Sequence, residues 1–409
     1  MSTQTSTGQF APRLLVLAST YPRWSGDPEP GFVHALCRRL TEAFEVHVVC
    51  PHARGALAEE VLDGVVVHRF RYAPGALESI VHGGGILSNL RHHPWKWLLV
   101  PLFFLGMYWK SWRLVHKLQP TCVHAHWIIP QGLVYAGLRL FQRKPVPMLL
   151  TAHGGDLFAL RSSPMIWLKN WVVREANMIT VVSQTMVAEA THLGAQPSEV
   201  HVVPMGVDFD VFTPDTTDAR SSHELLFVGR LVEKKGLRLL LEAMPLVVAK
   251  IPQSHLTIVG RGPEERLLRT LAETLGIGGK VRFLGALPHA ELPALYRRAA
   301  LFVAPFVEAS SGDREGLGLV TVEALACACP VIVGDLPALD DILEPEDTNL
   351  RVNPRLPQDL AEHIVNSLKQ PEAARAQAFR IRTRLLAHMS WEHVTRQYTK
   401  LLSEVQTRK

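Results

Sequence analysis

Two glutamates in the stretch DREGLGLVTVE are the first candidates for chemistry in this sequence. Glu315 and Glu323 have seven residues between them and bracket a glycine-rich apolar turn. The turn has the pattern of a loop that runs into a helix near 317–319, where free backbone N–H groups attract anions. Gly316 and Gly318 would let a phosphate approach that backbone. The alternative is that both acids only complement the helix dipole.

Two cations follow an apolar run that lies earlier in the chain. Arg230 comes directly after ELLFVG, and Lys235 stands just before Gly236 and an apolar helical pattern. Such a pair at the end of a strand can hold an anion, because a guanidinium grips a phosphate at two points. A solvated basic turn is the alternative. The glycine turn IVGRGPEE, with Gly260, lacks the full dinucleotide fingerprint and indicates either ligand contact or a tight connection.

Histidines stand at the ends of two apolar runs in the N-terminal half. TAHGGDLF places His153 before two glycines and Asp156, and VHAHWIIPQG presents His126. An imidazole in such a place can hydrogen-bond a ligand that lies at the ends of the strands. A histidine satisfied by neighbouring backbone is the alternative for both.

Short apolar runs alternate with helical patterns twice along the chain, and these elements must position the residues above. The N-terminal runs lie at 13–20, 44–51, 120–127, 146–156, 178–185 and 199–208, and the C-terminal runs at 224–230, 254–262, 280–286, 300–306 and 329–335. The alternation predicts an α/β fold with two doubly wound sheets. Because ligands bind at the carboxyl ends of such strands, two facing sheets would form a binding cleft.

The length of 409 residues fits two domains with a polar, proline-containing linker between them. The expected division is an N-terminal domain at 1–208, a linker at 209–224, a C-terminal domain at 225–387 and a terminal helix at 388–409. The polar N-terminus predicts no signal peptide. The apolar run 97–109 is too short to predict a membrane-spanning helix.

Charge and cysteine content exclude several classes of protein. The net charge of +5 indicates an anionic partner, but no motif of a nucleic-acid-binding protein accompanies it. Five scattered cysteines favour a reducing compartment over a disulfide framework. Cys327 and Cys329 have no further ligands at metal-binding spacing, so we expect buried thiols. The acid pair in VDFD (207–210) is interpreted as a turn, and no metal is expected.

These residues together carry a resemblance to a known family. The E-x7-E pair, preceded by G-R-x4-K and the order of the strands, resembles family 4 of the retaining glycosyltransferases over nearly the whole chain. The resemblance implies the GT-B fold, with two facing Rossmann-like domains and a C-terminal crossover helix. HAHW and HGGD are similar to stretches in members that build bacterial surface polysaccharides on lipid-pyrophosphate acceptors.

The resemblance implies a role for each candidate residue of the donor site. Glu315 would bind hydroxyls of the donor sugar, Glu323 the ribose, and Arg230 and Lys235 the diphosphate. Backbone that borders the donor would come from Gly31, Gly260, Gly316, Leu317, Gly318 and Leu319. His153 would face the reacting sugar and act with Glu315 in catalysis.

The resemblance also implies the partners. His126 and Asp156 would lie on the acceptor side. The donor would be a UDP-, GDP- or ADP-sugar, with no cofactor or metal required, and the acceptor a glycan or a polyprenyl-linked glycan. A sugar-nucleotide hydrolase or epimerase of the same fold, and a non-enzymatic basic membrane-binding module, remain alternatives.

A segment rich in basic and aromatic residues bears on the location of the protein in the cell. From Ser79 to Gly155 the chain has no Asp or Glu, while residues 91–117 carry four tryptophans and five lysines or arginines. Basic residues beside aromatic ones suit an anionic membrane surface. A buried helix pair with a solvated basic face is the alternative. We therefore expect a cytoplasmic protein, either free or peripheral on the inner face of the plasma membrane.

Overall fold

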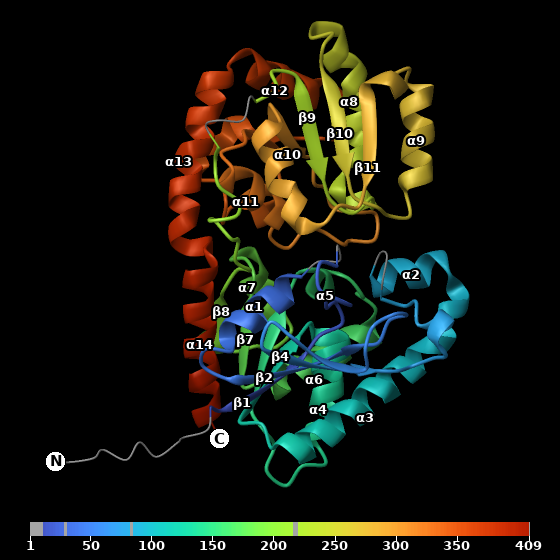
Figure 1. Ribbon diagram of the computed structural model, residues 1–409, viewed down its shortest axis with the longest axis vertical. Helices are drawn as coiled ribbons and strands as arrows, with labels where there is room; N and C mark the ends of the chain where they lie inside the picture. Colours follow the sequence, from blue (N-terminus) through green and yellow to red (C-terminus); the bar gives the residue numbers. More distant parts are fainter. Residues whose placement is uncertain (1–10, 28–30, 82–84, 216–219, 409) are drawn as a thin grey trace, which may run out of the picture.

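The computed structural model describes residues 11–27, 31–81, 85–215 and 220–408, and its elements form two stacked lobes (Figure 1). The N-terminal lobe is an eight-stranded sheet with its helices, and the C-terminal lobe is a six-stranded sheet with its helices. Both cores are built from buried Leu, Val, Ile and Phe side chains of the strands and of the helix faces that cover them. The predicted α/β fold with two mostly parallel sheets is confirmed.

The N-terminal sheet has the order β3-β4-β2-β1-β5-β6-β7-β8 and is parallel except for β3. Its strands are β1 (Arg13–Leu17), β2 (Glu45–Pro51), β3 (Glu59–Leu62), β4 (Val65–Phe70), β5 (Cys122–His126), β6 (Met148–Ala152), β7 (Met178–Val181) and β8 (Val200–Val202). Its helices are α1 (Phe32–Leu40), α2 (Ile86–His92), α3 (Val100–Leu118), α4 (Leu133–Arg139), α5 (Gly155–Phe158), α6 (Ser163–Glu175) and α7 (Thr185–His192).

The C-terminal sheet has the order β11-β10-β9-β12-β13-β14 and is parallel throughout its described pairs. Its strands are β9 (Glu224–Val228), β10 (His255–Val259), β11 (Val281–Gly285), β12 (Leu301–Ala304), β13 (Val331–Gly334) and β14 (Arg351–Val352). The helices in this half are α8 (Leu237–Lys250), α9 (Glu265–Thr274), α10 (Leu292–Arg298), α11 (Leu319–Ala326), α12 (Pro357–Lys369) and α13 (Pro371–Met389).

The strands β3, β4 and β14 were not among the predicted elements. β3 and β4 form an antiparallel hairpin at the sheet edge, where Asp63 and Gly64 adopt positive φ angles of 47° and 82°. An Asp-Gly pair is the usual signal for such a turn, but β3 alternates between exposed and partly buried residues and is not an apolar run. β14 has only two residues, which is too short for a pattern.

The chain returns to the N-terminal lobe at its C-terminal end. Helix α13 packs on α11, and α14 (Trp391–Thr407) packs on α1, β5 and β6 (Figure 1). Ser390 separates the two helices and caps α14 by accepting a hydrogen bond from the backbone N–H of His393. The expected crossover helix is therefore present.

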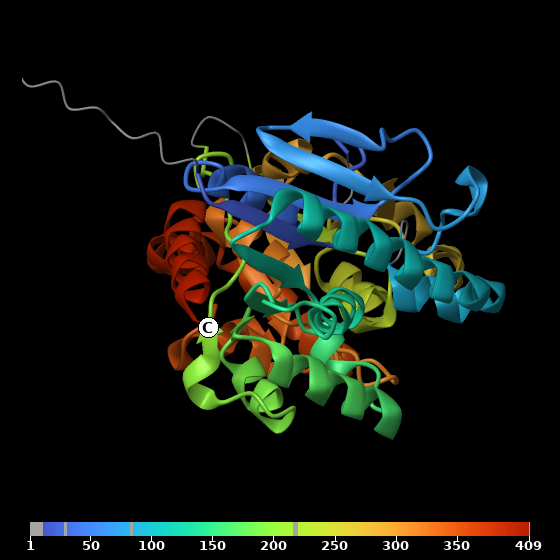
Figure 2. The ribbon, with the colours of Figure 1, turned by 90° about the horizontal axis from the view of Figure 1, so that it is seen from below.

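The chain passes between the lobes twice, once after Val207 and once at Ser390, and these two segments are hydrogen-bonded to each other. The backbone N–H of Val207 donates to Met389 O at 2.8 Å, and that of Trp391 donates to Val207 O at 3.2 Å. The domain limits expected from the sequence stay predictions, and residues 1–10, 216–219 and 409 of those ranges lie outside the described residues. Helix α3 runs across the N-terminal lobe when the molecule is viewed from below (Figure 2). Across the described chain, every helix is too short or too polar to span a membrane.

Candidate active site between the two sheets

The loops after β6 and β12 bring the two lobes into backbone contact. A Cβ atom added to Gly154 would lie 2.8 Å from Cα of Gly316, and one added to Gly316 would lie 2.6 Å from the carbonyl oxygen of His153. Real Cβ atoms do not approach so closely, so only glycines permit this contact. Gly154 also has a φ of +103°, which disfavours any side chain. The predicted residues His153 and Glu315 therefore lie on loops that touch.

An ion pair joins the two C-terminal lobe residues expected to hold the donor. Lys235 Nζ lies 2.7 Å from Glu315 Oε2, and the two side chains are 13% and 15% exposed. Burial would raise the pKa of Glu315, but the ammonium groups of Lys235 and Lys234 outweigh it and lower the pKa to about 2. Glu315 is therefore a carboxylate at any physiological pH, and Lys235 neutralises it.

Glycine 236 lets the turn that carries Lys235 pack against the end of β12. It has a φ of +70°, and a Cβ atom there would lie 1.8 Å from the carbonyl oxygen of Pro305. The ammonium of Lys235 lies 4.6 Å from the ring centroid of Phe306, within the range of a cation–π contact. Beside it, Lys234 pairs with Asp313 at 3.1 Å. This turn thus holds two cations beneath the loop that contains Glu315.

Arg230 is exposed directly after β9, at the boundary between the lobes. A Cβ atom added to Gly85 of the N-terminal lobe would lie 3.0 Å from its Nη1 atom. Gly260 follows the neighbouring strand β10 with a φ of +137°, and a Cβ atom there would lie 1.9 Å from the carbonyl oxygen of Gly229. The glycine therefore permits the tight packing of backbone just behind Arg230.

Glu323 lies on α11, which begins at Leu319 after Gly318 with a φ of +79°. Its side chain is buried, and its two oxygens accept from His289 Nε2 at 2.9 Å and from the Tyr296 hydroxyl at 3.2 Å. Burial would lower the pKa of His289, but the hydrogen bond and charge of Glu323 outweigh it and raise the pKa above 6.5. The carboxylate is thus held about one turn into α11, with its orientation fixed by two hydrogen bonds.

Sequence reasoning missed the two residues that hold Glu323. His289 follows β11 and Tyr296 lies in α10, so both are remote from the E-x7-E stretch in sequence. No spacing rule connects them to Glu323. The only signal for them in the sequence was that they follow a strand. Residues that follow parallel strands lie at the carboxyl edge of the sheet, where ligands bind.

On the N-terminal lobe, His153 and His126 form a stacked pair. His126 Nδ1 lies 2.9 Å from His153 Nε2, and the ring planes are 17° apart. The rings of Trp127 and Phe32 lie 4.8 Å and 5.1 Å from that of His153. Burial lowers the pKa of His153 to about 3, so the ring is neutral at physiological pH. Gly31, at the start of α1, directly precedes Phe32.

His126 and Asp156, predicted on the acceptor side, are both buried in the N-terminal lobe, and their contact with an acceptor stays a prediction. His126 is 0% exposed, beneath His153, and Asp156 is 8% exposed. The Asp156 carboxylate accepts from the backbone N–H groups of His153 at 3.0 Å and Ile128 at 2.9 Å. In the described structure both side chains therefore support His153 and its loop from inside the lobe.

The candidate metal motifs are accounted for by other contacts. Asp208 of VDFD pairs with Arg39 at 3.0 Å and accepts from the backbone N–H groups of Asp210 and Val211, as expected of a turn. The thiols of Cys327 and Cys329 are buried. In the part of the chain that the structure describes, no group of three or more His, Cys, Asp or Glu residues has the arrangement of a metal site.

The arrangement has the parts needed to bind a sugar attached to a phosphate. Arg230, Lys235 and the N-terminus of α11 offer positive charge and N–H groups to an anion. Glu315 and Glu323 offer carboxylate oxygens to hydroxyl groups. Leu317 is buried between the glycines that shape the loop, and Leu319 begins the helix. Of the predicted donor-side residues, Gly316 and Arg230 lie directly against the N-terminal lobe, and Glu315 adjoins Gly316 in sequence.

Comparison with known proteins gives the family. Residues 32–211 match the model of Glycosyltransferase Family 4, and residues 214–384 match the model of Glycosyl transferases group 1. A glycogen synthase of Mycobacterium tuberculosis is 31% identical over 299 residues, which are 70% of this chain and 67% of the relative. A GDP-mannose-dependent monoacylated alpha-(1-6)-phosphatidylinositol monomannoside mannosyltransferase of Corynebacterium glutamicum is 33% identical over 241 residues, 56% of this chain and 62% of that one.

The fold agrees with these matches. The sucrose-phosphate synthase of Thermosynechococcus elongatus superposes with a TM-score of 0.77 at 23% identity, covering 96% of this chain and 99% of that chain. With both halves of the sequence matched and two facing sheets in place, the chain belongs to family 4 of the glycosyltransferases and has the GT-B fold.

Proposed function

We propose that this glycosyltransferase moves a sugar, with retention of its anomeric configuration, from a nucleoside diphosphate sugar to a glycan or lipid-linked acceptor in cell-surface polysaccharide synthesis. The observation that carries the proposal is the ion pair between Lys235 and Glu315. Glu315 lies on the loop whose backbone contacts the His153 loop of the other lobe. It supports a site in which a cation and a carboxylate of one lobe act with a neutral imidazole carried by the touching loop of the other.

In this proposal the donor diphosphate binds to Arg230, Lys235 and the first N–H groups of α11. Because phosphate would then share the charge of Lys235, Glu315 would become available to accept hydrogen bonds from sugar hydroxyls. Glu323 would accept from the ribose, since each carboxylate oxygen has more lone-pair sites than the single partner it holds here. The donor would thus be held at its ribose, at its diphosphate and at its sugar.

The same groups would stabilise the diphosphate as it departs, where negative charge develops. The acceptor hydroxyl would attack on the face from which the diphosphate leaves. Its oxygen would bond to the anomeric carbon as the bond to the diphosphate breaks, and its proton would pass to the departing diphosphate, which accounts for retention without a nucleophile from the protein. Glu315 would position the sugar, and neutral His153 would hydrogen-bond it from the other lobe. The proposed catalytic residues are therefore His153 and Glu315.

A lipid-linked acceptor is supported by an exposed apolar stripe on the N-terminal lobe. Leu98, Leu102, Leu105 and Trp109 recur at helical spacing on α3 and the turn before it, and are 78%, 47%, 62% and 55% exposed. Such large side chains are usually covered in a protein that stays in water. We propose that this stripe, within residues 91–117, meets an anionic membrane on its cytoplasmic side.

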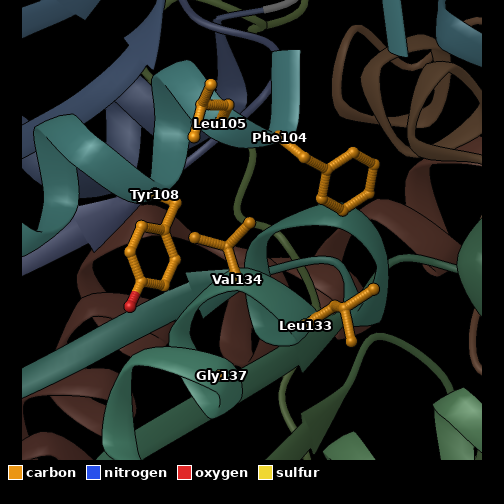
Figure 3. Close-up of a pocket in the computed structure, with 6 residues that line it drawn as sticks. All are labelled: Phe104, Leu105, Tyr108, Leu133, Val134 and Gly137. Atoms are coloured by element: carbon orange, nitrogen blue, oxygen red, sulfur yellow. The ribbon is translucent and has the colours of Figure 1, made fainter. Parts of the chain in front are cut away.

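The apolar stripe continues onto neighbouring helices. A groove of about 320 Å³ lies between α3 and α4, where Phe104 and Tyr108 project toward Leu133 and Val134 (Figure 3). Further exposed apolar residues of the lobe are Leu140, Phe141, Ile166 and Trp167. The name of the Corynebacterium relative, which specifies a phosphatidylinositol monomannoside, also supports a lipid acceptor.

A donor screen tests the proposed function. Purified protein is incubated with UDP-, GDP- and ADP-sugars, and its melting temperature is measured, because a ligand that binds the native state raises it. The sugar that stabilises the protein is then offered with lipid-linked and soluble glycan acceptors, and the anomeric configuration of the product is read by proton NMR. Transfer with inversion would refute the mechanism. Donor hydrolysis or epimerisation without transfer would instead identify a hydrolase or epimerase.

A further inference from the structure

The buried histidine beneath His153 has one ring nitrogen that is left without a partner. His126 is 0% exposed, and its Nδ1 atom shares a hydrogen bond of 2.9 Å with His153 Nε2. Its other nitrogen, Nε2, is buried and has no hydrogen-bond partner among the described residues. A neutral imidazole has one N–H and one bare nitrogen, so this unpartnered atom indicates where the protons are.

Two arrangements of protons are compatible with the bond between the rings. If His153 donates from Nε2, then Nδ1 of His126 must be bare and its proton must stand on the buried Nε2 atom, with no acceptor. If His126 donates from Nδ1, its Nε2 is only a bare lone pair. Buried N–H groups without acceptors are rarer in folded proteins than acceptors without donors. The second arrangement is therefore favoured.

This choice fixes the proton of His153 as well. Because its Nε2 atom accepts from His126, the single proton of the neutral ring must stand on Nδ1. His153 is partly exposed, its Nδ1 atom is not among the buried atoms without a partner, and no hydrogen bond to it is found among the described residues. The Nδ1–H group is thus available to a ligand, and it belongs to a residue whose backbone contacts Gly316 of the other lobe.

We propose that His126 is a positioning residue that holds neutral His153 in the tautomer with Nδ1 protonated, so that His153 donates a hydrogen bond to the sugar of the donor. The proposal rests on the proposed function for the identity of the ligand, but not for the proton positions. Without His126, the His153 ring could expose a bare nitrogen instead, which accepts from a hydroxyl group and cannot donate to one of its oxygens.

The surroundings of the pair hold both rings in place. The ring of His124 also lies 4.1 Å from that of His126, and its Nε2 atom shares a hydrogen bond of 2.7 Å with Thr151 Oγ1. The backbone N–H of His153 donates to Asp156. With the backbone of His153 and the ring of His126 held in place, the hydrogen bond from His126 is left to decide the tautomer.

Two matched variants test whether the position of the N–H group at residue 126 matters, or only its presence. His126→Asn places an amide N–H near the position of Nδ1, whereas His126→Gln places the same group near the position of Nε2. His126→Phe keeps the ring and removes both nitrogens. Thermal unfolding of each variant checks that the fold persists. The tautomer of His153 is read from the ¹⁵N shifts and ring-proton couplings in protein with ¹⁵N-labelled histidine, assigned by the loss of signals in His153→Gln.

The expected result is a His153 protonated at Nδ1 in the wild type and in His126→Asn, and a mixture of tautomers in His126→Gln and His126→Phe. Turnover with the identified donor should fall at least tenfold in the last two and recover in His126→Asn. A wild-type His153 protonated at Nε2 overturns the proposal, and this readout stands even where a variant fails to fold. An unchanged tautomer in His126→Phe also overturns it. If no nucleotide sugar is a substrate, the proposed function fails while the tautomer still decides the role of His126.

Discussion

Gly154 and Gly316 come from different lobes, and their backbones are in direct contact, with no room for a Cβ atom on either residue. The contact lies next to His153 in one lobe and next to Glu315 in the other. Any atom added here separates the two residues proposed to act on the sugar. The close approach of the lobes at this point therefore requires that neither residue has a Cβ atom.

Replacement of Gly316 by alanine should lower kcat/KM by about tenfold or more, since a displacement of about 1 Å at a reacting centre is costly. Its added Cβ atom would lie 2.6 Å from the carbonyl oxygen of His153 and force the loops apart. Gly155→Ala is the matched control, because there the new Cβ atom would meet only Asp313 Oδ1 at 3.8 Å. Steady-state kinetics of both variants measure the difference, and equal losses would contradict the steric explanation.

Glu315→Gln should reduce transfer by about a hundredfold or more while the fold persists, because removal of a charge-assisted hydrogen bond at a reacting centre costs several kcal/mol. The variant keeps the size of the side chain and leaves Lys235 without its carboxylate. Circular dichroism and turnover are measured together. Near-normal turnover would refute the role of Glu315 in positioning the sugar.

The stability of the protein should depend on acid through the same residue. The folded-state pKa of Glu315 is about 2, below the ordinary 4.5, so its contribution is present above pH 4.5 and is lost as the pH falls toward 2. The difference in unfolding free energy between wild type and Glu315→Gln should therefore shrink as the pH falls from 5 to below 3. A difference independent of pH would contradict this origin.

Glu323→Gln should lower the pKa of His289, because it removes the carboxylate that raises this pKa above 6.5. The shift is measured by NMR titration of the His289 ring protons. If Glu323 also accepts from ribose, the variant should bind nucleoside diphosphate about tenfold more weakly by calorimetry, as expected for one lost charge-assisted hydrogen bond. Unchanged binding would leave Glu323 with a structural role only.

Replacement of Leu98 and Trp109 by serine should weaken binding to vesicles that contain anionic phospholipid by about tenfold or more. The reason is that burial of each large apolar side chain in the membrane contributes about 2 kcal/mol of binding free energy. Leu267→Ser on α9 is the control, because Leu267 is 72% exposed but lies on the other lobe. Sedimentation with vesicles measures the bound fraction. Equal binding by both variants would exclude the apolar stripe as the membrane contact.

The sequence was sufficient to predict the positions of most buried strands along the chain, because each contains a short, mostly apolar run. It was also sufficient to predict the helix after Gly318, since the E-x7-E stretch carries a glycine turn before an apolar helix. The hairpin β3–β4 was missed because its edge strand is half polar. The Lys235–Glu315 bond and the burial of His126 were not predictable, because they depend on how closely two remote loops pack.

The two crossings between the lobes are paired with each other, Val207 with the segment around Ser390. A molecule joined at one point can swivel in any direction, but two joins that lie side by side define an axis. A Cβ atom on Gly206 would lie 2.6 Å from the Trp391 ring, so the chain is also tightly packed at this axis. Opening and closing about this axis is therefore the motion that we expect of the lobes, and in the arrangement described here Gly154 lies against Gly316.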